Sequence, residues 1–143
     1  MTAAQSPSKK PYLQMSLLYQ NLALDELGRP IYMGIFNQAE VPIPASLLFV
    51  ISNQYTNGFG AHRQHTVISD PDGEKFVESN ESQFIMQNVL GGHRVDERFG
   101  VTFTKPGRYA VRVYLDGEKV IEYFFLISER TPPRSTSDIE PQR

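Results

Sequence analysis

The chain of 143 residues contains no cysteine, so neither a disulfide framework nor a thiolate metal site is possible. Its 14 basic residues stand against 16 acidic ones, which excludes the basic excess typical of nucleic-acid binding. No apolar run approaches the roughly 20 residues that span a bilayer, and the polar N-terminus has no hydrophobic segment of a secretion signal behind its lysines. We therefore expect a soluble, cytoplasmic protein with neither nucleic acid nor a membrane as partner.

Hydrophobic residues make up 40% of the chain, and nine Phe and seven Tyr supply its bulky side chains. A chain of this length forms one domain and buries roughly two thirds of its unfolded surface. Both ends are polar and rich in Ser, Pro, Gln or Lys. We expect a disordered arm at residues 1–10, an ordered domain at residues 11–129 and a disordered tail at residues 130–143.

The ordered region alternates apolar and polar residues between turn signals at intervals too short for helices. The clearest strands flank the turns Pro106-Gly107 and Asp116-Gly117. The pattern predicts an all-β, immunoglobulin-like antiparallel sandwich of two sheets and seven to nine strands. We place strands at residues 15–24, 30–36, 46–52, 61–69, 75–78, 83–89, 94–103, 108–115 and 119–128.

The predicted core consists of the apolar residues on one face of each strand. These are Ile31, Ile35, Leu48, Val50, Val67, Phe84, Met86, Phe99, Val101, Tyr109, Val111, Val113, Tyr123 and Phe125. Tyr109 follows the Pro106-Gly107 turn, as does the tyrosine whose hydroxyl bonds back to a loop at a sandwich corner. We therefore expect Tyr109 to be structural.

The last hairpin forces a choice of register. A two-residue loop at Asp116-Gly117 would pair Val111 with Glu122 and place a carboxylate on the core face. A three-residue loop with a left-handed Gly117 instead groups the apolar residues of both strands, so we predict an odd loop with a G1 bulge.

That register places apolar residues on the outer face of the last strand, which carries Val120, Glu122, Phe124 and Leu126. An antiparallel strand with one solvated face is not expected to look like this. Either the N-terminal stretch, residues 12–18, or a second copy in a homodimer covers it. Arg98, Arg112 and Tyr114 could extend such an interface. Pairing of Phe103 with Tyr109 would set Arg98 opposite Tyr114, where a guanidinium on a ring contributes about 0.5–1 kcal/mol.

Several motifs resemble those of a bacterial family of small single-domain proteins known only as a domain of unknown function. They are residues 28–36, the Pro42-Ile43-Pro44 corner, the turn at residues 70–74 and residues 105–109. The resemblance covers residues 17–128. It implies an immunoglobulin-like sandwich and carries no activity, cofactor or site residue.

Three histidines, His62, His65 and His93, are candidates for a metal site. On a strand, His62 and His65 face opposite sides, so they chelate one ion only if they lie on a turn. The segment Asp70-Pro71-Asp72-Gly73 resembles the start of a calcium loop but lacks the later ligands, and a tight turn explains it fully. We find neither the G-x-S-x-G of a hydrolase nor a phosphate-binding loop.

These patterns contain abundant strand and turn chemistry but no convergent nucleophile, base or metal set. We therefore expect a non-catalytic binding or assembly module without a cofactor, whose partner is a protein or a second copy. The alternative is a small metal-dependent or carbohydrate-acting protein that uses His62, His65 or His93.

Overall fold

The computed structural model describes residues 8–131 and is all β. Its strands are β1 (Tyr12–Tyr19), β2 (Asn21–Leu24), β3 (Pro30–Met33), β4 (Gln38–Val41), β5 (Ala45–Thr56), β6 (Gly60–Ser69), β7 (Lys75–Glu78), β8 (Ser82–Met86), β9 (Gly92–Phe103), β10 (Gly107–Leu115) and β11 (Glu118–Glu129). The sheets are open rather than closed into a barrel. None of the described residues forms a helix long and apolar enough to cross a membrane.

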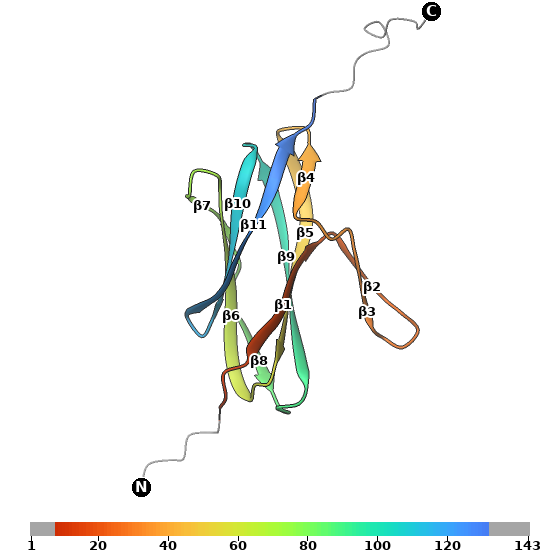
Figure 1. Ribbon diagram of the computed structural model, residues 1–143, viewed down its shortest axis with the longest axis vertical. Coiled ribbons are helices and arrows are strands. Elements are labelled where there is room, and N and C mark those ends of the chain that lie inside the picture. The colour runs from red at the N-terminus through yellow and green to blue at the C-terminus, as the bar shows by residue number, and fades with distance from the viewer. Residues whose placement is uncertain (1–7, 132–143) are drawn as a thin grey trace, which may run out of the picture.

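The strands form two main layers and a small hairpin (Figure 1). One layer is the three-stranded sheet β1-β5-β9, and the other is the six-stranded sheet β4-β11-β10-β6-β7, in which β8 also pairs with β6. β4 runs parallel to β11, whereas the other neighbours are antiparallel. β2 and β3 pair only with each other in the described part of the chain.

The core lies between the two layers and is rich in aromatic rings. Phe49 of β5 stacks on Phe99 of β9 with ring centroids 5.3 Å apart. Tyr109 of β10 stacks on Phe125 of β11 at the same distance and meets Phe103 edge-on at 5.1 Å. These rings join both sheets in one cluster, so aromatic packing holds the layers together.

Nine strands were expected, and eleven form. The segment predicted as one strand at residues 15–24 divides into β1, which stays in the three-stranded sheet, and β2, which leaves it. The four-residue β4, which runs parallel to β11, was missed. Residues 1–7 and 132–143, where the sequence predicts disordered ends, lie outside the described residues. Lys9 already exchanges two backbone hydrogen bonds with Phe59, before the expected start of the domain at residue 11.

Seven predicted core residues are buried as expected: Phe84, Met86, Phe99, Tyr109, Val111, Val113 and Phe125. Three others, Ile31, Ile35 and Leu48, are exposed, so their core assignment was wrong. Ile31 belongs to the hairpin that leaves the layers, and Ile35 follows it. Leu48 is 78% exposed because β5 buries Phe49 and Ile51 instead. Val50, Val67, Val101 and Tyr123 are half-buried.

The last hairpin has the predicted side-chain pairing but reaches it by another route. Tyr109 pairs with Phe125, Val111 with Tyr123 and Val113 with Ile121. The loop, however, has two residues, and both Asp116 and Gly117 have positive φ, as in a type I′ turn. A bulge at Val120 supplies the odd residue, so the expected three-residue loop was wrong.

Candidate functional site

A hollow of about 590 Å³ opens beside the β10–β11 turn. Its lining comes from β6, β8 and the turn: Ala61, His62, Arg63, Gln83, Phe84, Ile85 and Asp116. Phe84 stacks on Tyr55 at 5.2 Å and anchors β8 to the core. The hollow therefore combines an apolar wall with a polar pair, His62 and Asp116, as ligand-binding sites commonly do.

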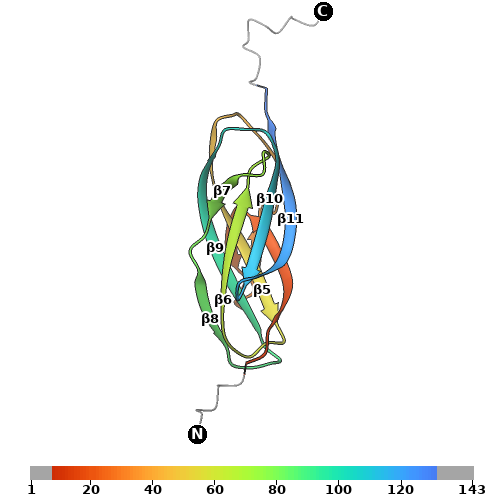
Figure 2. The ribbon, with the colours of Figure 1, turned by 90° about the vertical axis from the view of Figure 1, so that its left-hand side faces the viewer.

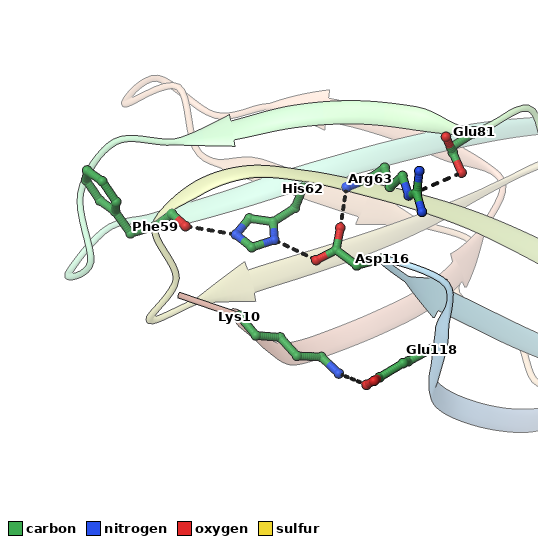
Figure 3. A network of polar contacts seen from close by, with 7 residues as sticks. All are labelled: Lys10, Phe59, His62, Arg63, Glu81, Asp116 and Glu118. Atoms are coloured by element: carbon green, nitrogen blue, oxygen red, sulfur yellow. Dashed lines mark hydrogen bonds and ion pairs between the residues drawn. The ribbon is translucent and has the colours of Figure 1, made fainter. Parts of the chain in front are cut away.

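His62 is buried, and both of its ring nitrogens are engaged (Figure 3). Nδ1 lies 2.8 Å from the Asp116 carboxylate, and Nε2 lies 2.9 Å from the carbonyl oxygen of Phe59. A carbonyl oxygen can only accept, so Nε2 carries a proton, and an ionised Asp116 likewise requires a donor at Nδ1. Both ring nitrogens are therefore used in contacts within the fold.

Asp116 fastens the β10–β11 turn to β6. One carboxylate oxygen receives the backbone N–H of Arg63 at 3.0 Å and the other faces His62, while the N–H of Asp116 donates to the Arg63 carbonyl at 2.8 Å. Asp116 has a left-handed backbone with φ of 51°, which Asp and Asn tolerate better than most residues. Asn57, in the β5–β6 connection, has a φ of 58° for the same reason. Asp116 thus has two roles: its backbone forms the turn, and its carboxylate binds β6.

Two exposed ion pairs border this cluster (Figure 3). Arg63 approaches Glu81 at 3.8 Å, and Lys10 pairs with Glu118. Such surface pairs contribute little to stability. The contacts of His62 and Asp116 therefore link β6 to the β10–β11 turn.

The three histidines do not converge. His65 stacks on Tyr114 with centroids 4.8 Å apart and lies 3.7 Å from Glu78. His93 stacks on Phe84 at 4.9 Å, while His62 lies on the inner side of β6. Among residues 8–131, no three His, Asp or Glu side chains are arranged to hold a metal ion. The parity argument that separated His62 from His65 therefore holds.

A second candidate surface is the outer face of the six-stranded sheet, which we call the outer face and define by Arg108, Arg112, Tyr114, Phe124 and Leu126. Phe124 and Leu126 are each 42% exposed. The Arg108 guanidinium lies 4.2 Å above the Phe124 ring.

Polar partners fill the rest of this outer face. Arg112 binds Glu122 at 2.7 Å and Ser69 at 2.7 Å. The two cations beside Glu122, Arg112 and Lys119, lower the pKa of that carboxyl. Tyr114 stacks on His65 in the neighbouring strand. The charges at this end of the face are matched, whereas the Phe124 end stays apolar.

Two residues of the predicted interface lie elsewhere. Val120 sits at the bulge and packs against the core, because the extra residue turns its side chain away from the face. Arg98 belongs to β9, which pairs with β5 and not with β10, so it does not lie opposite Tyr114. Residues 12–18 do not pair with β11, since β1 pairs with β5 in the other sheet, but residues 16–18 border Phe124 across a hollow of about 360 Å³ and leave that ring partly exposed. The closest link of β1 to β11 is a 2.8 Å hydrogen bond between Ser16 and the hydroxyl of Tyr123, whose pKa burial raises to about 12.

Sequence reasoning missed a buried polar network between the sheets. Gln64 and Thr66 of β6 donate to one carboxylate oxygen of Glu97 at 2.5 and 2.6 Å. The side-chain oxygen of Gln64 accepts two hydrogen bonds, from the Tyr55 hydroxyl at 2.5 Å and from the Asn53 side-chain amide at 3.1 Å. The second oxygen of Glu97 has no well-formed hydrogen bond among the described residues, and the Ser79 hydroxyl lies near this carboxylate. Burial raises the pKa of Glu97 and, together with the Glu97 charge, that of Tyr55.

The model of a family of unknown function, DUF6941, matches residues 14–128. No curated protein matches the chain. Solved structures similar to it include the Pseudomonas fluorescens alkylpurine DNA glycosylase AlkC bound to DNA, with 10% identity and a TM-score of 0.44 over 79% of this chain and 30% of that one. A β-glucosidase from Listeria innocua has 11% identity and a TM-score of 0.45 over 80% of this chain and 16% of the enzyme.

Proposed function

Because the chain belongs to this family, whose description assigns no activity, we propose from its own geometry that it is a non-catalytic assembly module of immunoglobulin-like sandwich type. It associates with other protein copies through the outer face. The single observation that carries the proposal is the exposed apolar end of that face, formed by Phe124 and Leu126 beneath Arg108.

The topology supports the immunoglobulin-like part of this proposal. β1-β5-β9 and β11-β10-β6 correspond to the two antiparallel sheets of such a sandwich, and they enclose one core. The Tyr109 hydroxyl donates to the Lys105 carbonyl at 2.8 Å, at the corner between the two sheets where that fold places its tyrosine. β4 and the β2–β3 hairpin are then additions between the first two long strands.

The polar groups support the non-catalytic part. His62 is the buried imidazole of the hollow beside the β10–β11 turn, and its two nitrogens contact Asp116 and the Phe59 carbonyl. Glu97 is the carboxylate with the strongest burial, but its side-chain oxygens lie inside the core. A general acid or base must reach a substrate proton, and neither group does so in this arrangement.

The residue types of the outer face support association. Aromatic residues and Arg are enriched at the centres of protein interfaces, where truncating one residue costs 2 kcal/mol or more. Arg108 stacked on Phe124 combines a large apolar area with a fixed donor group. A two-sheet domain with one such face needs a partner surface to remove it from water.

Light scattering over a range of protein concentrations tests the proposal. We expect the average mass of the wild type to rise with concentration, and Phe124→Glu to weaken association by roughly 30-fold or more. Leu90→Glu is the matched control, because Leu90 is an almost fully exposed leucine in the β8–β9 connection. A wild type that stays monomeric at every concentration, or a Phe124→Glu variant that associates like the wild type, would overturn the proposal.

A further inference from the structure

The hairpin of β2 and β3 projects from the body of the molecule (Figure 1). We call residues 21–33 the arm. Its strands pair with each other, Leu22 with Tyr32 and Ala23 with Ile31, and with no other strand in residues 8–131. Tyr32 packs edge-on against Tyr19 of β1 at 4.9 Å and anchors the base. Beyond that contact, the arm lies outside both layers.

The tip of the arm is rigidly built. The Asp25 carboxylate accepts the backbone N–H of Leu27 at 2.9 Å and that of Arg29 at 2.8 Å, and its other oxygen pairs with the Arg29 side chain at 2.6 Å. These bonds lower the pKa of Asp25, with the Arg29 backbone as the largest cause. Gly28 supplies the positive φ of 77° that the turn requires. A tip so well defined presents its side chains in fixed positions.

Those side chains are apolar and exposed. Leu27 at the tip is 77% exposed and Leu24 is 63% exposed. Ile31 and Met33, on the other face of the hairpin, are also exposed. An isolated two-stranded hairpin is at best marginally stable in water, and exposed apolar patches mark interaction sites. The arm therefore has the composition of an element that is completed by another surface.

The arm projects away from the outer face, although its base lies near it: Ile35, just after the arm, lines one hollow with Phe124. In Figure 1 the arm extends to the right of the β1-β5-β9 sheet, while β10, β6 and β7 form the left-hand layer. In Figure 2, where the six-stranded sheet faces the viewer, the arm lies behind it. One copy therefore cannot place its own arm on its own outer face.

The charges of the two surfaces are complementary. Glu26 is exposed at the tip of the arm beside Leu27, and Arg108 is exposed beside Phe124 and Leu126. Neither residue takes part in an ion pair within the described part of the chain. Two outer faces brought together about a two-fold axis would instead bring Arg108 near its symmetry mate, which is unfavourable.

We propose that the arm of one copy docks on the outer face of the next, so that copies join head to tail. The inference rests on the proposed function and names the occupant of its surface. Leu24 and Leu27 cover Phe124 and Leu126, and Glu26 meets Arg108. Since the two surfaces are different, every added copy leaves one arm and one face free, and the product is an open chain or a closed ring.

Complementation of two variants tests this arrangement by light scattering. Leu27→Glu inactivates the arm and keeps the face, whereas Phe124→Glu inactivates the face and keeps the arm. Both positions are solvent-exposed, so both variants are expected to fold. We expect the wild type to exceed the mass of a dimer, each variant alone to be monomeric, and an equimolar mixture to form a dimer and nothing larger.

The outcomes separate this inference from the proposed function. If the wild type is monomeric, the proposed function fails. If Phe124→Glu blocks association but Leu27→Glu behaves like the wild type, the face is an interface and only the docking of the arm is wrong. If both variants are monomeric and their mixture stays monomeric, head-to-tail docking is overturned.

A charge exchange gives an independent readout of the same contact. Glu26→Arg and Arg108→Glu each place like charges together, and we expect each to weaken association about tenfold at low salt. The double variant carries the pair in reverse order and is expected to associate nearly as well as the wild type. A double variant weaker than either single variant would show that the two residues do not meet.

Discussion

The hydroxyl of Tyr109 donates a hydrogen bond to the carbonyl of Lys105, four residues earlier, at 2.8 Å. The bond closes the chain corner between β9 and β10, where the polypeptide passes from one sheet to the other. The ring of Tyr109 lies in the core against Phe103 and Phe125. Burial accordingly raises the pKa of the phenol. One side chain thus fixes both the corner and the packing of the layers.

Two substitutions separate these roles. Tyr109→Ala removes the ring and is expected to lower the free energy of unfolding by about 3–5 kcal/mol. Tyr109→Phe keeps the ring, loses only the bond to Lys105 and is expected to cost about 0.5–1.5 kcal/mol. Urea denaturation measures both. A loss below 1 kcal/mol for Tyr109→Ala would contradict the core placement.

The first residue of β10 supports a second prediction. Gly107 has φ of 137°, and a Cβ added there would lie 2.7 Å from Cγ of Pro71. Gly107→Ala therefore combines backbone strain with a steric clash, and we expect a loss of about 3 kcal/mol or more. Gly28→Ala is the control, because Gly28 also has positive φ but open space around it. That variant is expected to cost about 1–2 kcal/mol. Equal losses in thermal or urea denaturation would contradict the clash.

The strands and the Tyr109 corner could be predicted from sequence because period two and the turn residues are local signals. Which face of β5 points into the core could not be predicted in this way. Residues 47–51 are Leu, Leu, Phe, Val and Ile, so both faces of the strand are apolar and parity is undefined. The structure buries Phe49 and Ile51 and exposes Leu48.

On β6 the alternation was predicted correctly, but the inward face was assigned wrongly, because that face is polar. Its inner face carries His62, Gln64 and Thr66, which look like solvent-facing residues in the sequence, whereas Val67 lies on the half-buried outer side. Glu97, the partner of Gln64 and Thr66, comes from β9, more than thirty residues away in the chain. A signal was present, since Glu97 occupies the inward row of β9 between Val95 and Phe99. Only the fold shows that Gln64 and Thr66 meet it.

The contact between Asp116 and His62 makes a third prediction. Asp116→Gly preserves the positive φ of the turn but removes the bonds to His62 and to the Arg63 N–H. Hydrogen bonds to charged groups contribute about 1.5–3 kcal/mol, so we expect a loss of about 2 kcal/mol in urea denaturation. Asp116→Asn keeps an acceptor without the charge, so its free energy of unfolding is expected to lie between those of the wild type and Asp116→Gly. If the losses of Asp116→Gly and His62→Gln are fully additive in the double variant, the two side chains do not act as a pair.

The last prediction concerns the pH dependence of stability at Glu97. Burial raises the pKa of this carboxyl above its ordinary value of about 4.5. The folded protein therefore holds the proton more tightly than the unfolded chain. The stabilisation from this group is fully present below the unfolded pKa and is lost as pH rises through the folded pKa. Above that value the folded state contains a buried charge with one oxygen that lacks a well-formed hydrogen bond among the described residues.

Glu97→Gln keeps an acceptor for Gln64 and Thr66 but cannot ionise. We expect its free energy of unfolding to increase relative to that of the wild type as pH rises from 4 to 8, because the variant avoids the buried charge. An unsatisfied buried acceptor costs about 1–3 kcal/mol, which sets the scale of the gain. Urea denaturation at several pH values in this range measures the difference between the two proteins.

Glu122→Gln is the matched comparison with the opposite sign. Arg112 and Lys119 lower the pKa of Glu122, so its stabilisation is present above the unfolded pKa and is lost as pH falls through the folded pKa. Relative to the wild type, this variant is expected to become less stable as pH rises, by a small amount because the pair is exposed. The Glu122→Gln curve should therefore change mainly below about pH 4.5, whereas the Glu97→Gln curve should change above that pH and in the opposite direction. A flat curve for Glu97→Gln would mean that Glu97 titrates in the folded protein as it does in the unfolded chain, and that the polar network fully supports its charge.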